Sequence, residues 1–303
     1  MGPSQIPPKL VAESIFKAIT GKKLSLEERI VVDLRIPRVL MAFLTGIALS
    51  TSGVVMQAIF RNPLADPFVL GISAGACVGA ILGILLFFDV YSVSLLAFLT
   101  SLLAIFTVYN LARVRGRITT ESLLLSGIAV NFFLYALEWL MLITFNRAHL
   151  ILTWLVGFFG NVEWLDVEVS LIPVLLGVVV VWFFYRDLNA MAFGEETAHY
   201  LGIDVATVRK VLLAVVSLIT AICTAFVGIV GFVGLMIPHI ARTIVGANHR
   251  ELIPSSALIG GIFLVWADTF ARTFMNDSVP VGIVTMLCGA PFFLYLLRTK
   301  QKI

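Results

Sequence analysis

Long apolar blocks separated by short polar turns constrain this chain most strongly. A helix of about 20 predominantly apolar residues crosses the hydrocarbon core of a bilayer. Backbone exposed to lipid must satisfy its own hydrogen bonds, so blocks of this length are expected to be helices. The sequence therefore predicts an all-α integral membrane protein, a polytopic bundle of about nine transmembrane helices. The blocks run roughly over 39–59, 68–88, 91–111, 122–145, 167–185, 211–230, 232–246, 252–270 and 279–297.

The composition excludes a soluble globular protein. Of the 303 residues, 60% are hydrophobic and 13% are charged, whereas soluble domains average about 45–50% apolar and about 25% charged residues. The cysteines Cys77, Cys223 and Cys288 lie inside apolar blocks without paired spacing, and the histidines are isolated from one another. We therefore expect buried cysteines, no disulfide and no metal site. Nothing in the sequence indicates a nucleic-acid partner.

A glycine ladder follows the polar turn 61–67. Its members recur every four residues and so share one face of a helix. Glycines on one face let a neighbouring backbone approach closely, as is common between helices in membranes. The ladder predicts tight helix packing at Gly71, Gly75, Gly79 and Gly83.

The basic residues of the loops indicate the orientation, because cytoplasmic loops carry an excess of lysine and arginine. Between spans, the opposite set of loops holds only Arg147 and Arg272. The carboxyl terminus is thus expected inside and, with nine spans, the amino terminus outside. Residues 1–38 are predicted to be an external amphipathic leader and 39–303 the transmembrane domain. The basic set is Arg61, Arg113, Arg115, Arg117, Arg186, Arg209, Lys210, Arg242, Arg250, Arg298, Lys300 and Lys302.

The segment 150–160 is apolar but too short to cross a bilayer. Trp154 lies within it and Trp164 lies just beyond it, and tryptophan is enriched at headgroup level. An interfacial or re-entrant helix is expected there.

The largest cytoplasmic loop, 186–210, contains a short helix-forming stretch between two glycines. Its first turn is acidic, which suits the positive end of a helix dipole, and two apolar residues three positions apart can face a partner. An ordinary amphipathic connector and a docking helix for a cytoplasmic subunit both fit this pattern. The residues are Gly194, Glu195, Glu196, Ala198, Leu201 and Gly202.

Charged groups near or within the spans carry further hypotheses. Glu138 lies inside a span, where carboxylates are costly, and is expected either to line an aqueous pathway or to reach the outer interface. Asp268 precedes Arg272 by four residues, so the two can pair on one helix face. Arg35 and Arg38 precede the first span. They suit carboxylates on a partner protein or serve as interfacial anchors.

Motifs for catalysis are missing from the sequence. It contains no GxxxxGK[ST] phosphate loop, no HExxH and no GxSxG. We therefore expect a chain that is no enzyme and binds no cofactor.

Several strings, in this order, resemble the FecCD-type (BtuC-like) permeases. These are membrane subunits of ABC importers for iron–siderophore complexes, haem and vitamin B12. The resemblance covers nearly all of residues 30–300. The matching strings are LRIPR (34–38), NPLADP (62–67), LGISAGA (70–76), GEETAHYLGI (194–203), GFVGLMIPHIAR (231–242), AD with Arg272 (267–272) and VPVGIVTMLCGAPFFLYLL (279–297).

The resemblance implies an assembly in the cell membrane of a prokaryote. Two permeases form a homodimer around a pathway for an iron chelate or a corrinoid. Two cytoplasmic ATPases carry the ATP and magnesium, and an external binding protein delivers the cargo. By position, 194–202 is the helix that couples the permease to the ATPase. Arg35, Arg38 and Arg272 would meet the binding protein, and Thr119, Thr120 and Ser122 would form the cytoplasmic gate.

One feature departs from the family pattern of ten spans: the apolar helix expected before the region of Leu10–Ile36 is missing. Two other functions therefore stay open at this point, a secondary transporter and a non-functional truncated permease. A secondary transporter would need ion-coupling charges near the midplane of the bilayer, and Glu138 alone is thin support for one.

Overall fold

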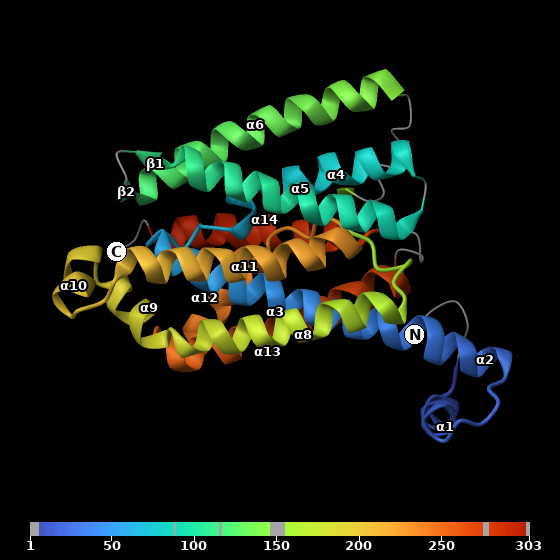
Figure 1. Ribbon diagram of the computed structural model, residues 1–303. Coiled ribbons are helices and arrows are strands. Elements are labelled where there is room, and N and C mark those ends of the chain that lie inside the picture. The colour runs from blue at the N-terminus through green and yellow to red at the C-terminus, as the bar shows by residue number, and fades with distance from the viewer. Residues whose placement is uncertain (1–5, 88, 115–116, 146–154, 275–278, 301–303) are drawn as a thin grey trace.

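The computed structural model describes residues 6–87, 89–114, 117–145, 155–274 and 279–300, and these are almost entirely helical (Figure 1). A small antiparallel hairpin pairs Arg113 with Ile118 and Val114 with Arg117. The helices are α1 (Pro8–Ile19), α2 (Leu26–Arg29), the π-helical turn η1 (Ile30–Arg35), α3 (Ile36–Ile59), the 3₁₀ turn η2 (Pro67–Leu70), α4 (Ile72–Leu86), α5 (Val90–Leu111), α6 (Thr120–Phe145), α8 (Trp164–Phe183), α9 (Tyr185–Ala192), α10 (Glu195–Tyr200), α11 (Val205–Val227), α12 (Val233–Val245), α13 (His249–Phe274) and α14 (Val281–Lys300), and the strands are β1 (Arg113–Val114) and β2 (Arg117–Ile118).

The described helices confirm the predicted helical membrane bundle. Six of them are long and apolar enough to cross a membrane, and three more are shorter and apolar. Each corresponds to one of the blocks read from the sequence. The six are Leu26–Ile59, Val90–Leu111, Thr120–Phe145, Trp164–Phe183, Val205–Val227 and His249–Thr273, and the three are Ile72–Leu86, Val233–Val245 and Val281–Leu294.

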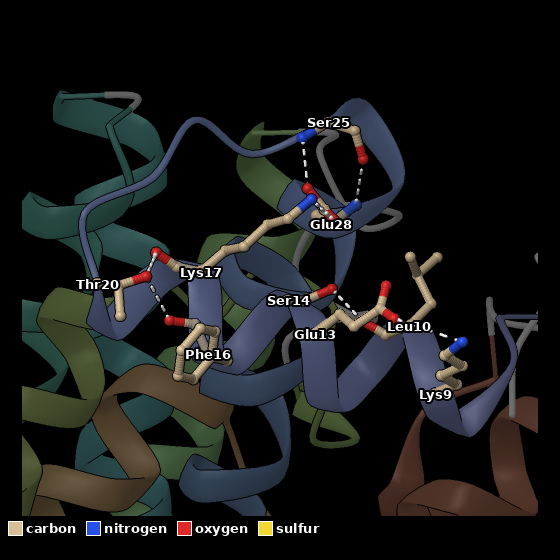
Figure 2. A network of polar contacts seen from close by, with 9 residues as sticks. All are labelled: Lys9, Leu10, Glu13, Ser14, Phe16, Lys17, Thr20, Ser25 and Glu28. Carbon is tan, nitrogen blue, oxygen red and sulfur yellow. Dashed lines mark hydrogen bonds and ion pairs between the residues drawn. The ribbon is translucent and has the colours of Figure 1, made fainter.

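The first long helix begins earlier than the sequence pattern suggested. Leu26–Ile59 runs on through α2, η1 and α3, so part of the predicted leader belongs to the helix itself. Only α1 stands apart, at the end of the bundle where the chain starts (Figure 1). The Lys17 ammonium lies 2.6 Å from Glu28 Oε1, and Ser25 and Glu28 form a capping box at the start of α2 (Figure 2).

The helix α3 forms the centre of the molecule, between α8, α11, α12 and α13 (Figure 1). Glycines allow these contacts. A Cβ on Gly46 would overlap the Gly260 carbonyl of α13, and a Cβ on Gly53 would overlap the Gly234 carbonyl of α12. The close approaches at Gly46 and Gly53 were not predicted from the sequence.

The predicted glycine ladder lies between α4 and α5. A Cβ on Gly75 would lie 2.8 Å from the Thr100 carbonyl oxygen, and one on Gly83 would lie 2.6 Å from Val93 Cα. A Cβ on Gly79 would overlap the Thr100 hydroxyl. Gly71 differs from the others because it precedes α4 with a φ of +87° and meets only ordinary contacts. Its glycine is required by the left-handed turn rather than by helix packing.

The helix α6 lies at the periphery, packed on α4 and α5 but diverging from them (Figure 1). Large apolar side chains are exposed along it, among them Phe132, Phe133 and Trp139. Glu138 of the same helix is buried beside Cys77 of α4, and both roles expected for it stay predictions. Trp154, within the segment 150–160, lies outside the described residues. Trp164, beyond that segment, begins α8, and its indole N–H donates to the Val32 carbonyl at 3.0 Å.

Candidate functional site

The segment 185–204 is folded back on one end of the bundle, beside the β1–β2 hairpin (Figure 1). Two glycines with positive φ make its turns: Gly194 at +127° precedes α10, and Gly202 at +82° ends it. The Ile203 N–H donates to the Ala198 carbonyl at 3.1 Å, which completes a glycine C-cap. Asp204 then caps α11, and hydrogen bonds from the Thr207 hydroxyl and N–H hold the pKa of its carboxyl below the usual range.

Three apolar side chains of this segment are exposed, namely Phe193 at 83%, Tyr200 at 88% and Leu201 at 67%. Ala198 is fully buried, so the expectation that it would face a partner together with Leu201 needs correction. Ala198 packs α10 onto the bundle instead. Phe193 and Tyr200 were not predicted from the sequence, although Phe193 directly precedes Gly194 and Tyr200 lies two residues before Gly202.

Glu195 connects α10 to two other elements. It forms an ion pair with Arg209 of α11, a buried arginine. The Thr120 hydroxyl, in the first turn of α6, donates to Glu195 Oε1 at 3.3 Å. Arg209 Nη1 in turn donates to the Ile118 carbonyl of β2 at 2.7 Å. The predicted coupling helix is thus joined through Glu195 and Arg209 to the start of α6. Glu196, the other acidic residue of its first turn, is exposed.

The other two predicted gate residues cap α6. The Ser122 N–H donates to Thr119 Oγ1, and the Thr119 N–H donates to Ser122 Oγ, both at 3.1 Å. Their hydroxyls therefore satisfy backbone groups at the helix start. Thr120 alone of the three is brought to the coupling segment, and the gate role of all three stays a prediction.

The opposite end of the bundle holds a buried carboxylate between two arginines. Arg38 Nη2 lies 2.8 Å from Asp268 Oδ1, and its Nε donates to the same carboxylate at 3.1 Å. Arg272 Nε lies 3.0 Å from Asp268 Oδ2. The predicted Asp268–Arg272 pair is confirmed. Arg38 was missed as its third member because it is 230 residues away in the sequence.

These contacts bear on the residues expected to meet a binding protein. The side chains of Arg38 and Arg272 are only 13% and 9% exposed, and Arg38 also lies 5.7 Å from the Phe158 ring centroid. Arg35, in η1, is half-buried. The docking role of the three arginines stays a prediction.

Comparisons with known proteins agree with this architecture. Residues 2–299 match the model of the FecCD transport family. The chain is 45% identical, over 90% of its length and 74% of the relative's, to the cobalamin import system permease protein BtuC of Halobacterium salinarum. It is 38% identical, over 92% of its length and 86% of the relative's, to an iron chelatin transport system permease protein of Helicobacter pylori.

A solved structure of an inward-facing metal-chelate type ABC transporter superposes with a TM-score of 0.84 at 28% identity, covering 97% of this chain and 100% of that one. The match in sequence to the family and the match in fold to the solved structure thus cover nearly the same residues. The chain belongs to the FecCD transport family, the membrane-embedded permeases of ABC importers, and is a transport subunit rather than an enzyme.

Proposed function

We propose that two copies of this chain form the membrane pathway of an importer for a metal chelate. Two cytoplasmic ATPase subunits, which bind the ATP and magnesium, drive it, and an external binding protein delivers the cargo. The observation that carries the proposal is the segment around α10, where Phe193, Tyr200 and Leu201 are exposed together at one end of the bundle. Exposed apolar surface of this kind on a folded segment indicates a protein partner.

The contacts of Glu195 support a route from that partner to the membrane helices. A displacement of α10 is transmitted through Glu195 to Arg209 in α11 and to Thr120 at the start of α6. Charge-assisted hydrogen bonds are shorter and stronger than neutral ones, and so they hold α10 firmly to these two helices. In the proposed cycle, ATP binding to the partner changes the relative stability of outward-open and inward-open arrangements of these helices.

The cargo proposed is an iron chelate or a corrinoid. The relatives reported above are named for cobalamin and for iron chelatin. Both belong with this chain to one family, so membership of the family does not choose between the two classes of cargo. Uptake of radioactive cobalamin and of radioactive iron chelates, compared in vesicles that contain the complete transporter, separates the two. The class that is taken up against a gradient, and only with ATP, is the cargo.

The coupling assignment is tested with Leu201→Asp. A carboxylate in the exposed apolar surface of the α10 segment should abolish copurification of the ATPase in mild detergent, because a charge would be buried without a partner. Leu26→Asp is the matched control, since Leu26 is also exposed but begins α2, which lies at the far end of the bundle (Figure 1). If the Leu201→Asp chain still brings down an equal amount of ATPase, the coupling assignment is wrong.

A further inference from the structure

A second feature of the cytoplasmic end is a pocket of about 310 Å³ next to the α10 segment. It lies between the end of α3 with the turn that follows, the last residue of α9, and the α12–α13 turn. Its polar lining consists of Gln57, Arg61, Asn62, Arg242 and His249. The volume is roughly that of ten water molecules in the liquid, which leaves room for a side chain.

The pocket is positively charged, and the described residues supply no carboxylate that pairs with its arginines. No carboxylate is among its lining residues. Among the ion pairs formed by the described residues, none includes Arg61 or Arg242. Two guanidinium groups on one small cavity repel each other, and partial burial weakens the screening of that repulsion by solvent. The pocket therefore favours an anion.

Arg61 occupies a backbone position that normally belongs to glycine. Its φ is +45°, and it follows the last residues of α3. The Asn62 N–H donates to the Gln57 carbonyl at 3.2 Å, so Arg61 is the left-handed residue of a Schellman C-cap. A side chain with a Cβ is disfavoured in this conformation. Such strain is typical of residues whose side chain has a function.

The pocket also contains buried polar atoms without partners among the described residues. His249 is 4% exposed, its Nδ1 lies 2.7 Å from Asn189 Oδ1, and its Nε2 has no hydrogen-bond partner. Gln57 Oε1 has none either. Because Asn189 Oδ1 can only accept, Nδ1 carries the proton and Nε2 is left as an acceptor. Buried polar groups usually have hydrogen-bond partners, so both acceptors are available to donors that enter the pocket.

We propose that this pocket receives an acidic side chain of the partner ATPase, a second contact beside the α10 segment. The proposal rests on the proposed function, since it assumes an ATPase on this end. Arg61 Nη1 lies 3.7 Å from the position that a Cβ on Gly194 would take. Ala192 also lines the pocket, so a protein that binds at Phe193 lies within reach of it. A carboxylate pairs with both guanidinium forks, and water that enters with it donates to Gln57 Oε1 and His249 Nε2.

The test uses Arg61→Gly and Arg242→Gln permeases, purified in mild detergent and titrated with the purified ATPase. Glycine suits the backbone of position 61, so the Arg61→Gly chain should melt at the same temperature as the wild type or higher. Its dissociation constant for the ATPase should nevertheless rise about tenfold, as should that of Arg242→Gln. The increase should be smaller at high salt than at low salt. Arg250→Gln, an exposed arginine outside the pocket on the same end, is the control and should stay within about twofold.

Three results would overturn the proposal. The first is an unchanged dissociation constant for both pocket variants while Leu201→Asp abolishes binding, which would leave the proposed function intact. The second is an equal rise in the dissociation constant for Arg250→Gln, which would show that the effect depends on the overall positive charge of this end and not on the pocket. The third is a rise in melting temperature of the isolated wild-type chain with inorganic phosphate or anionic lipid that Arg61→Gly removes, since the occupant would then be a phosphate. If Leu201→Asp also leaves binding unchanged, the proposed function itself fails.

Discussion

Each end of the bundle contains a pair of neighbouring arginines of which one comes from the α3 region, Arg38 with Arg272 and Arg61 with Arg242, and the two pairs differ in charge balance. At one end, Arg38 and Arg272 share the buried carboxylate of Asp268. At the other end, Arg61 and Arg242 line a pocket without a carboxylate among the described residues. The first pair holds α3 and α13 together. The second pair leaves its charge available to another molecule.

Arginines that hold a membrane protein together and arginines that bind a partner differ in where their nearest carboxylate lies. A buried guanidinium needs a carboxylate from its own chain, because removing an ion from water costs several kcal/mol per ion. An arginine at a solvent-exposed helix end keeps part of its hydration. It therefore requires no carboxylate from its own chain and can pair with one from a partner protein. Proximity to a loop does not distinguish the two cases in the sequence, but the position of the nearest carboxylate in the fold does.

The largest effect is expected from Asp268→Ala. This change leaves two largely buried guanidinium groups without their anion, and breaking a buried pair costs about 3–5 kcal/mol. The free energy of unfolding, measured on the detergent-purified chain, should fall by that amount. Adding Arg38→Gln and Arg272→Gln to Asp268→Ala should recover a large part of the loss. A loss below about 1 kcal/mol would mean that this end is hydrated and that both ends behave alike.

A steric change between the two ends is expected to cost less. A Cβ added by Gly79→Ala would overlap the Thr100 hydroxyl and the Leu96 carbonyl of α5, and overpacking of this kind costs about 1–3 kcal/mol. Melting of the purified chain measures it. Gly231→Ala is the matched control, because the nearest atom to its new Cβ would be Met286 Cε at 3.9 Å. Equal losses for the two variants would contradict close packing between α4 and α5.

The helical blocks were predictable from the sequence because hydropathy and length are local properties. The blocks correspond to the described apolar helices even for Val233–Val245, which is shorter than a full span. The start of the first helix at Leu26 was not predictable, since charged residues interrupt its early turns. A capping box and a π-helical turn carry the backbone through that region.

The site was predictable only where a pair is close in sequence. Asp268 and Arg272 are four residues apart and were paired from the helix period. Arg38 joins them from 230 residues away, and Arg209 reaches Glu195 across the coupling segment. Contacts of this kind depend on which helices become neighbours, which hydropathy does not encode. The same limit explains why Ala198 was expected on an exposed face.

The smallest effect on stability, and the sharpest on coupling, is expected from Glu195→Gln. Arg209 is only 4% exposed, but the glutamine keeps an oxygen that accepts from it, and the Glu195 side chain is 41% exposed to solvent. The free energy of unfolding should therefore fall by only about 1 kcal/mol. ATPase binding should persist, because Phe193, Tyr200 and Leu201 stay in place. Transport per ATP hydrolysed, measured in reconstituted vesicles, should drop severalfold, since α10 loses its charged link to Arg209. Glu196→Gln is the control, because Glu196 is exposed and lies next to Glu195 in α10. Equal ratios for the two variants would show that α10 acts on the bundle through its apolar contacts alone, and the charge of the cytoplasmic end would then serve docking but not transmission.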